Sequence, residues 1–215
     1  MNFSDSSSVE HESIRRALQE STSFVNGLVL DAGCGARPYE QIVVEAGGRY
    51  VGIDVEIRGN RGADVVANSL NLPFKDETFN TILSTQVIEH VRDPSRLMEE
   101  AARVLKRGGH LILTAPMMWP LHEEPYDFFR FTRFGLECLV EHSGLTCMRL
   151  DERTGGWRSL AQLLALTLND IFGKKRFPRV LSKLVMVPVM FLATLLDRLL
   201  PYRKLTLGYL LIAKK

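Results

Sequence analysis

A short glycine turn lies between two apolar runs, each of which ends in an acidic residue. The first run, 28–31, is followed by Gly33 and Gly35. The second run, 50–54, ends in Asp54 about 20 residues beyond the turn, a spacing typical of a βαβ unit that binds a nucleotide or nucleoside. Glycine allows a positive φ and lets a ligand lie against the backbone. Asp54 could then accept hydrogen bonds from both hydroxyls of a ribose.

The turn also narrows the choice of ligand. A dinucleotide fingerprint needs a third glycine where this chain has Pro38, and the chain lacks the Gly-Lys-Ser/Thr of a phosphate-binding loop. Asp31 stands just before the turn, where its charge would repel a pyrophosphate and favour a cationic ligand. S-adenosylmethionine carries an ammonium, a sulfonium and a ribose but no phosphate, so it fits both acids.

A second group of reactive residues lies in a long loop at 116–132, which is dense in aromatic residues and holds one histidine and three acids. Long loops of this kind are usually functional. His122 is the candidate general base, because the pKa of an unperturbed imidazole lies near neutrality. Asp127 is a second candidate for catalysis or acceptor binding. The alternative is that His122, Asp127 and Arg130 form a hydrogen-bond and ion-pair network that only braces the loop.

The elements that must position these residues alternate between strand and helix signals. One helix is predicted over 94–106, with Asp93 as N-cap and Gly108 near its C-cap, and another over 133–142 after Thr132. The alternation implies a doubly wound, largely parallel sheet, in which ligands bind beyond the carboxyl ends of the strands. The predicted strands are 28–31, 49–54, 63–67, 79–84, 109–115, 145–150 and 205–213.

Several segments between Val29 and Leu113 resemble class I S-adenosylmethionine-dependent methyltransferases, most closely the small single-domain "type 11" kind. This resemblance implies a Rossmann-like sheet of seven strands whose last strand is antiparallel. It also implies in-line transfer of a methyl group. The matching segments, in the family's order and spacing, are Leu30-Asp31-Ala32-Gly33-Cys34-Gly35, Val51-Gly52-Ile53-Asp54, Leu72-Pro73-Phe74, 79–84, Ile88-Glu89-His90-Val91 and 103–109.

The resemblance assigns further residues to the cofactor. Asn68 stands where the family usually has an acid near the adenine amino group, and its amide oxygen can still accept from that amine. The pattern and the resemblance together place the cofactor against Asp31, Ala32, Gly33, Cys34, Gly35, Asp54, Val55, Asn68, Ser69, Leu70, Thr85 and Gln86.

The acceptor side is less defined. The loop resembles a His-x-x-Pro-x-Asp-x-x-Arg-Phe-Thr segment of methyltransferases linked in bacteria to cell-surface glycan or small-molecule biosynthesis, which implies a small-molecule, lipid-linked or glycan acceptor. We expect His90 to cap the helix after the fourth strand and Glu89 to be a surface acid. No metal-ligand pattern is visible. A non-catalytic scaffold that binds S-adenosylmethionine and a nicotinamide-dependent reductase remain alternatives.

Length and composition fit one α/β domain in the cytoplasm. The chain has 215 residues, and its three cysteines lack metal-site spacing. We divide it into a flexible N-terminus with a short helix (1–20), a cofactor-binding core (21–154), a helical insertion (155–204) and the last strand (205–215). Residues 1–150 carry 15 basic and 21 acidic side chains, whereas residues 151–215 carry 12 and 4.

The insertion is the part that the resemblance does not cover. Helices are predicted near 159–172 and 179–200, and the uncharged run 184–196 is shorter than the 20 or so residues of a spanning helix. The insertion could cover the sheet edge or pair two copies as a homodimer. It could instead lie on the inner face of the membrane through 174–200, as a peripheral contact. We expect no nucleic-acid partner. The basic residues that would meet anionic head groups are Lys174, Lys175, Arg176, Arg179 and Lys183.

Overall fold

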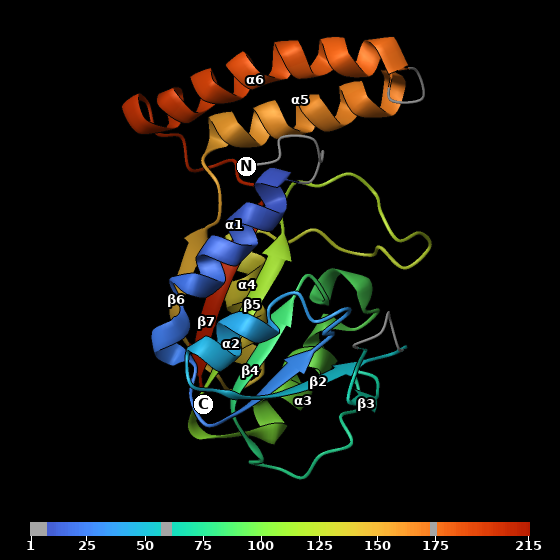
Figure 1. Ribbon diagram of the computed structural model, residues 1–215. Coiled ribbons are helices and arrows are strands. Elements are labelled where there is room, and N and C mark those ends of the chain that lie inside the picture. The colour runs from blue at the N-terminus through green and yellow to red at the C-terminus, as the bar shows by residue number, and fades with distance from the viewer. Residues whose placement is uncertain (1–7, 57–61, 173–175) are drawn as a thin grey trace.

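The protein folds around a seven-stranded sheet with the order β3-β2-β1-β4-β5-β7-β6 (Figure 1). The computed structural model describes residues 8–56, 62–172 and 176–215, with side chains for all of these except 8 and 172–184. Strand β7 runs antiparallel to both neighbours, and the other strand pairs are parallel, which confirms the predicted fold. The strands are β1 (Leu28–Ala32), β2 (Arg49–Asp54), β3 (Val65–Val66), β4 (Phe79–Thr85), β5 (Leu105–Pro116), β6 (Thr146–Glu152) and β7 (Gly208–Lys214).

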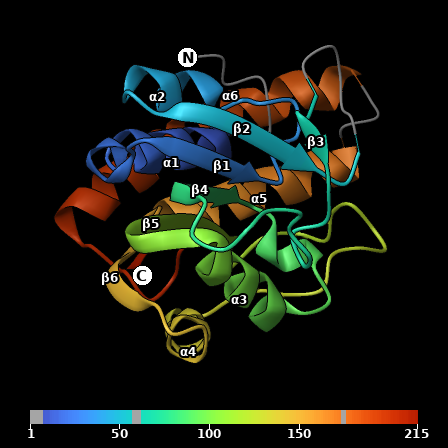
Figure 2. The same ribbon diagram turned by 90° about the horizontal axis from the view of Figure 1, so that it is seen from below.

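Helices cover both faces of the sheet (Figure 2). On one face, α1 (Ser8–Gln19) and α2 (Glu40–Glu45) pack on every second residue of the central strands, including Val29 and Ile112. On the other face, α3 (Pro94–Val104) and α4 (Arg133–His142) pack on the alternate residues, including Leu30 and Leu111. Side chains alternate between the faces of a strand, so one apolar run supplies two cores.

The predicted starts of α3 and α4 are confirmed, and the predicted end of α3 is wrong. Asp93 accepts a hydrogen bond from the Arg96 amide, and the Thr132 hydroxyl accepts one from the Gly135 amide. Helix α3 ends at Val104, because Leu105 is already extended and pairs with Phe79 in the sheet. Gly108, with φ of 76°, therefore lies within β5 and does not cap α3.

At the N-terminus, the sequence predicts disorder up to about Val9 and a helix from there to about Glu20, and residues 1–7 of this stretch lie outside the described residues. Beyond them the short helix is present as α1, and it begins at Ser8, earlier than expected. Val9 is buried in it. The ion pair of Glu10 with Arg153, which has a buried guanidinium, fastens α1 to the end of β6. Helix α1 is thus part of the core.

The insertion forms two antiparallel helices, α5 (Gly156–Phe172) and α6 (Arg176–Leu199), which lie across one end of the molecule (Figure 1). The Asp197 carboxylate near the end of α6 accepts hydrogen bonds from the amides of Trp157 and Arg158 at the start of α5. In addition, the Trp157 indole donates to the carbonyl of Leu200. Helix α5 is therefore capped by its own partner helix.

Candidate cofactor and acceptor site

The glycine turn lies at the carboxyl ends of β1 and β2 and is fixed by backbone hydrogen bonds. The amides of Gly33 and Cys34 both donate to the carbonyl of Ile53, at 2.9 Å each. The Gly35 amide donates to Oδ2 of Asp54 at 2.9 Å. A carboxylate has about four lone-pair sites, so Asp54 retains the capacity to accept from two more hydroxyls.

The two glycines of the turn have different surroundings. A Cβ at Gly33 would lie 2.3 Å from a methyl of Val87, so Gly33 is needed for close packing against the segment after β4. A Cβ at Gly35 would have no neighbour within 4 Å, although its φ of 52° is one that glycine adopts readily. Gly35 is therefore the glycine with open space beside it for a ligand.

Asp31 is fully buried at the end of β1. Its Oδ2 accepts a hydrogen bond from the Tyr50 hydroxyl, whereas its Oδ1 has no hydrogen-bond partner among the described residues. Burial raises the pKa of Asp31 to about 7, and the Tyr50 hydrogen bond opposes that shift. A cation beside the unpartnered oxygen would stabilise the charged form. Tyr50 was not expected at this site, because a tyrosine inside a predicted strand belongs to no motif that marks a binding residue.

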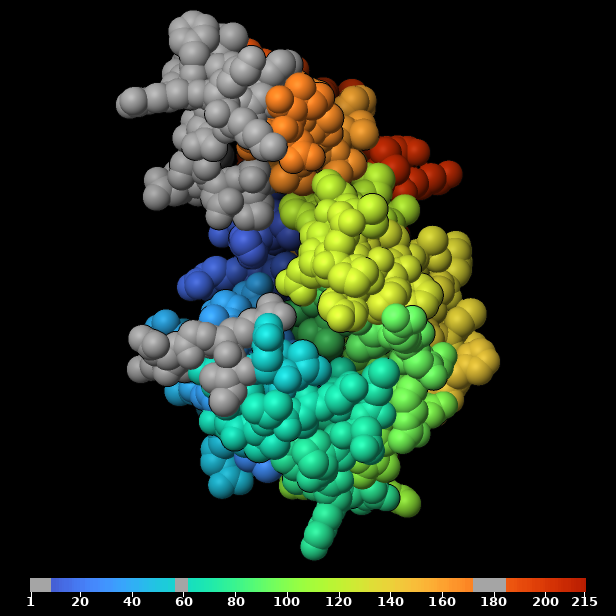
Figure 3. All heavy atoms as spheres, turned by 90° about the vertical axis from the view of Figure 1, so that its right-hand side faces the viewer, coloured from blue at the N-terminus to red at the C-terminus, as the bar shows by residue number. Residues whose placement is uncertain are grey.

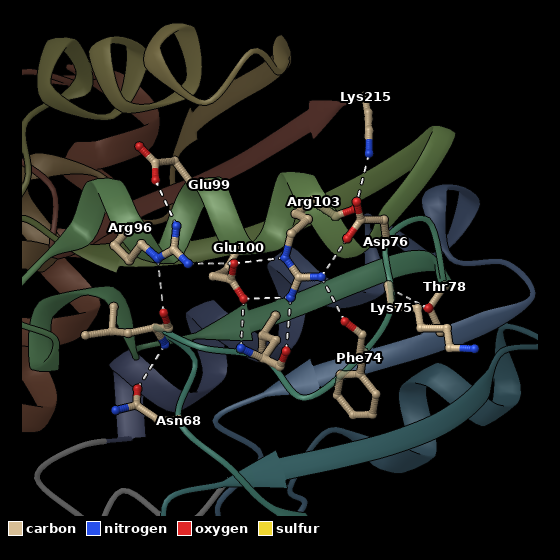
Figure 4. A network of polar contacts seen from close by, with 12 residues as sticks. Asn68, Phe74, Lys75, Asp76, Thr78, Arg96, Glu99, Glu100, Arg103 and Lys215 are labelled. Atoms are coloured by element: carbon tan, nitrogen blue, oxygen red, sulfur yellow. Dashed lines mark hydrogen bonds and ion pairs between the residues drawn. The ribbon is translucent and has the colours of Figure 1, made fainter.

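The segment expected to line the adenine is held by an ion-pair network on α3 (Figure 4). The buried Glu100 carboxylate accepts from the Leu72 amide at 2.8 Å and also binds Arg96 and Arg103. Arg96 in turn donates to the carbonyl of Leu70. The Glu100 pKa is lowered, most of all by its hydrogen bond with Arg103. This network fixes the backbone on which the expected adenine contacts lie.

The other predicted cofactor residues lie at the same edge of the sheet with different exposure. Asn68 is exposed and its Oδ1 accepts from the Leu70 amide, while Ser69 is buried. Gln86 has a φ of 54°, and its side chain donates to the Thr114 hydroxyl. Ala32, Cys34 and Thr85 are buried, Leu70 is half-buried and Val55 is exposed.

Cys34 is a packing residue of the turn. Its side chain is buried against Gly52, where a Cβ would lie 2.9 Å from the sulfur. Burial raises its pKa to about 11, so the thiol stays protonated. A thiol that stays protonated is a poor nucleophile, so Cys34 fills space in the turn.

The loop at 117–132 contains the expected His122–Asp127–Arg130 network. The Asp127 carboxylate binds the Arg130 guanidinium in a bidentate manner at 2.6 and 2.7 Å and lies 3.1 Å from Nδ1 of His122. The hydrogen bond from Arg130 holds the Asp127 pKa well below its usual range. Asp127 therefore orients other groups and is unsuited to take a proton. His122 is half-buried, and its Nδ1 is the ring nitrogen that faces Asp127.

The turn after β4 brings two more side chains to this loop, and both differ from expectation. Glu89 is not a surface acid: it is fully buried, and neither carboxylate oxygen has a hydrogen-bond partner among the described residues. His90 does not cap α3, because its Nδ1 lies 2.9 Å from the carbonyl of Tyr126 in the loop. The rings of His90 and His122 meet edge to face, with centroids 4.7 Å apart.

The surface is hollowed between the loop at 117–132, in yellow-green, and the blue-to-cyan segments that follow β1 and β2 (Figure 3). Three features at this edge suit S-adenosylmethionine: the open side of Gly35, the remaining acceptor capacity of Asp54, and the unpartnered oxygen of Asp31. In that order, they could allow the ligand's close approach, accept from its ribose hydroxyls and pair with its ammonium.

Comparison with known proteins finds a family whose model includes the residues at this edge of the sheet. A family model described as "Methyltransferase domain" matches residues 30–113. The match agrees with the resemblance of the sequence motifs to class I S-adenosylmethionine-dependent methyltransferases. The match to this methyltransferase domain ends within β5, so it includes the glycine turn, Asp54 and Glu89 but excludes His122 and the helical insertion.

One curated relative agrees with the match to a methyltransferase domain. A human protein named "Probable tRNA methyltransferase 9B" is 37% identical over 133 residues, which are 59% of this chain and 28% of that protein. The chain thus spans less than a third of that relative's length.

Solved structures share the fold of the methyltransferase domain. The [4+2]-cyclase SpnF has a TM-score of 0.60 at 19% identity and covers 94% of this chain and 79% of its own. A Burkholderia thailandensis 1,6-didemethyltoxoflavin-N1-methyltransferase, solved with its substrate and S-adenosylhomocysteine, has a TM-score of 0.59 at 14% identity and covers 98% and 84%. At such identities the likeness shows the fold, and one fold can carry different chemistries.

Proposed function

We propose that this chain transfers the methyl group of S-adenosylmethionine to a small-molecule or lipid-linked acceptor bound against the loop at 117–132. The observation that carries the proposal is one of position. The glycine turn packs on Val87, and two and three residues later Glu89 and His90 lie close to His122 of the loop. The donor and acceptor groups therefore share one edge of the sheet.

On the donor side, Asp54 would bind the ribose hydroxyls and Asp31 the ammonium. The adenine would lie along Asn68, Ser69 and Leu70, and the methionine part beside Thr85 and Gln86. Ala32, Cys34 and Val55 would complete the wall.

On the acceptor side, the bound cofactor supplies an electrophilic methyl on a sulfonium. The protein's part is to hold the acceptor atom in line with that methyl. His122 would take the proton from an acceptor hydroxyl or amine, with Asp127 as the positioning residue that keeps the ring turned.

The donor site is tested by calorimetry with S-adenosylmethionine. Two charge-assisted hydrogen bonds of roughly 1.5–3 kcal/mol each predict that Asp54→Ala weakens binding at least tenfold. Asp170→Ala, which removes an exposed carboxylate on α5, is the matched control and should bind like the parent. Equal affinity of both variants for S-adenosylmethionine would show that Asp54 does not bind the cofactor.

The acceptor is tested by transfer of a labelled methyl group into separate pools of small metabolites, lipid extract and tRNA. We expect label in the first or second pool. Label in tRNA alone would overturn the acceptor class and favour the activity in the human relative's name. Tight donor binding with no label in any pool would favour the scaffold alternative.

We further propose that 155–204 is a separate unit that rests on an anionic membrane surface. Apolar side chains on α6 support this, since Phe191 is 74% exposed and Leu199 66% exposed. Among the described residues, no helix has both the length and the apolar character needed to cross a bilayer. Lys174 and Lys175 lie outside the described residues, as do the side chains of Arg176, Arg179 and Lys183, so their contribution rests on sequence.

Flotation with anionic vesicles tests the membrane proposal. Binding that weakens with salt, and that Phe191→Asp removes, is the expected result. A stable dimer that Phe191→Asp dissociates, without vesicle binding, would show that a second copy covers this face instead.

A further inference from the structure

One group beside the loop is not explained by the donor site or by the loop network. Glu89 is fully buried, and both of its carboxylate oxygens lack a hydrogen-bond partner among the described residues. Burying an unpaired carboxylate is strongly unfavourable unless a cation or a proton compensates it. We propose that Glu89, His90 and His122 bind a divalent transition-metal ion.

The three side chains already converge. One ligand atom from each lies within 4.8 Å of the other two, and Oε1 of Glu89 is 3.9 Å from Nε2 of His90. Metal–ligand bonds of about 2.0–2.2 Å place neighbouring ligand atoms roughly 3–3.5 Å apart. Closing the site therefore requires side-chain shifts of about an ångström, within the range of small rotations.

Both imidazoles are oriented as metal ligands usually are. Nδ1 of His90 faces the carbonyl of Tyr126 at 2.9 Å, and Nδ1 of His122 faces Asp127 at 3.1 Å. A carbonyl and a carboxylate can only accept, so each Nδ1 carries the hydrogen and each Nε2 keeps its lone pair. Metal-bound histidines have this arrangement, in which an outer oxygen holds the ring and fixes its tautomer.

The outer partners are themselves held in place. Asp127 is bound by Arg130, which also donates to the carbonyls of Trp119 and Pro120. The Glu89 carbonyl accepts from the amides of Phe128 and Phe129, which fastens the loop to the turn after β4. Glu89 and His90 thus come from the segment that the family model matches, and His122 comes from the loop beyond it.

The donor set selects the kind of metal. Two imidazoles and one carboxylate favour Zn²⁺ and its neighbours Mn²⁺, Fe²⁺ and Co²⁺ over Mg²⁺ and Ca²⁺, which prefer sites built of oxygen. Three protein ligands leave at least one position for another molecule. That this position takes the acceptor's oxygen, and lowers the pKa of its hydroxyl so that the proton is released to solvent, rests on the proposed function. With the metal bound, the Nε2 lone pair of His122 is used for coordination, so activation by the metal replaces His122 as the base. The binding of the metal itself does not depend on the proposed function.

The test measures metal directly on the full chain, after treatment with chelator and without methyl acceptor. Titration with Zn²⁺, and with Co²⁺ followed by its visible absorption, should give one ion per chain. Glu89→Gln and His122→Ala should each weaken binding at least tenfold. His142→Ala is the control, since His142 is a histidine on α4 that contacts the Cys138 carbonyl, and it should leave binding unchanged.

Affinity for S-adenosylmethionine is measured on every variant, which separates misfolding and failure of the donor site from loss of metal. His122 is on the loop and half-buried, so its variant keeps the test valid if Glu89→Gln fails to fold. The proposal is overturned by the absence of stoichiometric binding, or by binding that both variants retain. A chain that binds metal but transfers no methyl group would keep this site and refute only the proposed activity.

Discussion

The buried Asp31 makes the protein's stability depend on pH in a way that one substitution should remove. Its pKa rises from 3.8 to about 7 on folding, chiefly because burial disfavours the charged form. The folded state therefore holds a proton that the unfolded state releases between these two values. This contribution to stability is complete below about pH 3.8 and is lost as the pH rises through about 7.

The size of the effect follows from the shift. One pKa unit corresponds to about 1.4 kcal/mol, so ionising Asp31 inside the fold costs about 4 kcal/mol in total. By the linkage relation, the free energy of unfolding of the parent protein falls by about 2.5 kcal/mol between pH 5 and pH 9 because of Asp31. Asp31→Asn keeps an acceptor for the Tyr50 hydroxyl but cannot ionise. The variant should therefore gain stability over the parent as the pH rises.

Urea unfolding of both proteins at pH 5, 7 and 9 measures this difference. The free energy of unfolding of Asp31→Asn minus that of the parent should grow by about 2.5 kcal/mol across the range. Asp170→Asn, which changes an exposed carboxylate, should show no such trend. A difference for Asp31→Asn that stays constant with pH would refute the reasoning. The stabilised variant should also bind S-adenosylmethionine more weakly, because it lacks a charge for the ammonium.

Four further substitutions, with Glu99→Gln as a control for one of them, probe the site. Gly35→Val should fold but lose S-adenosylmethionine binding in calorimetry; normal binding by this variant would show that Gly35 does not contact the donor. Gly33→Val should lower the thermal midpoint, because its Cβ would lie 2.3 Å from the side chain of Val87. Glu100→Gln should cost roughly 3–5 kcal/mol of unfolding free energy by denaturant titration, while Glu99→Gln, at an exposed pair, should cost less than about 1 kcal/mol. His122→Ala should slow label transfer while donor affinity stays within a few-fold, and transfer at the parent's rate would leave His122 with a bracing role only.

Local patterns predicted most of the fold. Apolar runs gave the strand positions, and the caps at Asp93 and Thr132 depend only on residues within one helical turn, so a sequence contains them. The end of α3 was wrong because Leu105 pairs with Phe79 on another strand. That competing interaction is distant in sequence and outweighs the local signal of Gly108.

The acceptor side needed the structure for a similar reason. Glu89 follows a strand and precedes a histidine, which looks like a surface turn. Its burial arises because the loop at 117–132 folds back over it and donates to its carbonyl. Tyr50 and Glu100 were missed because their partners, Asp31 and the Leu72 amide, lie 19 and 28 residues away. Such pairings depend on topology, which single-residue propensities do not encode.

The two ends of the helical insertion are joined to each other before the helices begin. The Leu207 amide donates to the Thr154 hydroxyl, and the Arg153 amide donates to the Gly208 carbonyl, so β6 and β7 meet as the two arms of a hairpin would. The chain between them behaves as a closed loop, and the entropy of closing a loop grows only slowly with its length. Evolution can therefore lengthen, shorten or exchange this segment without rebuilding the sheet.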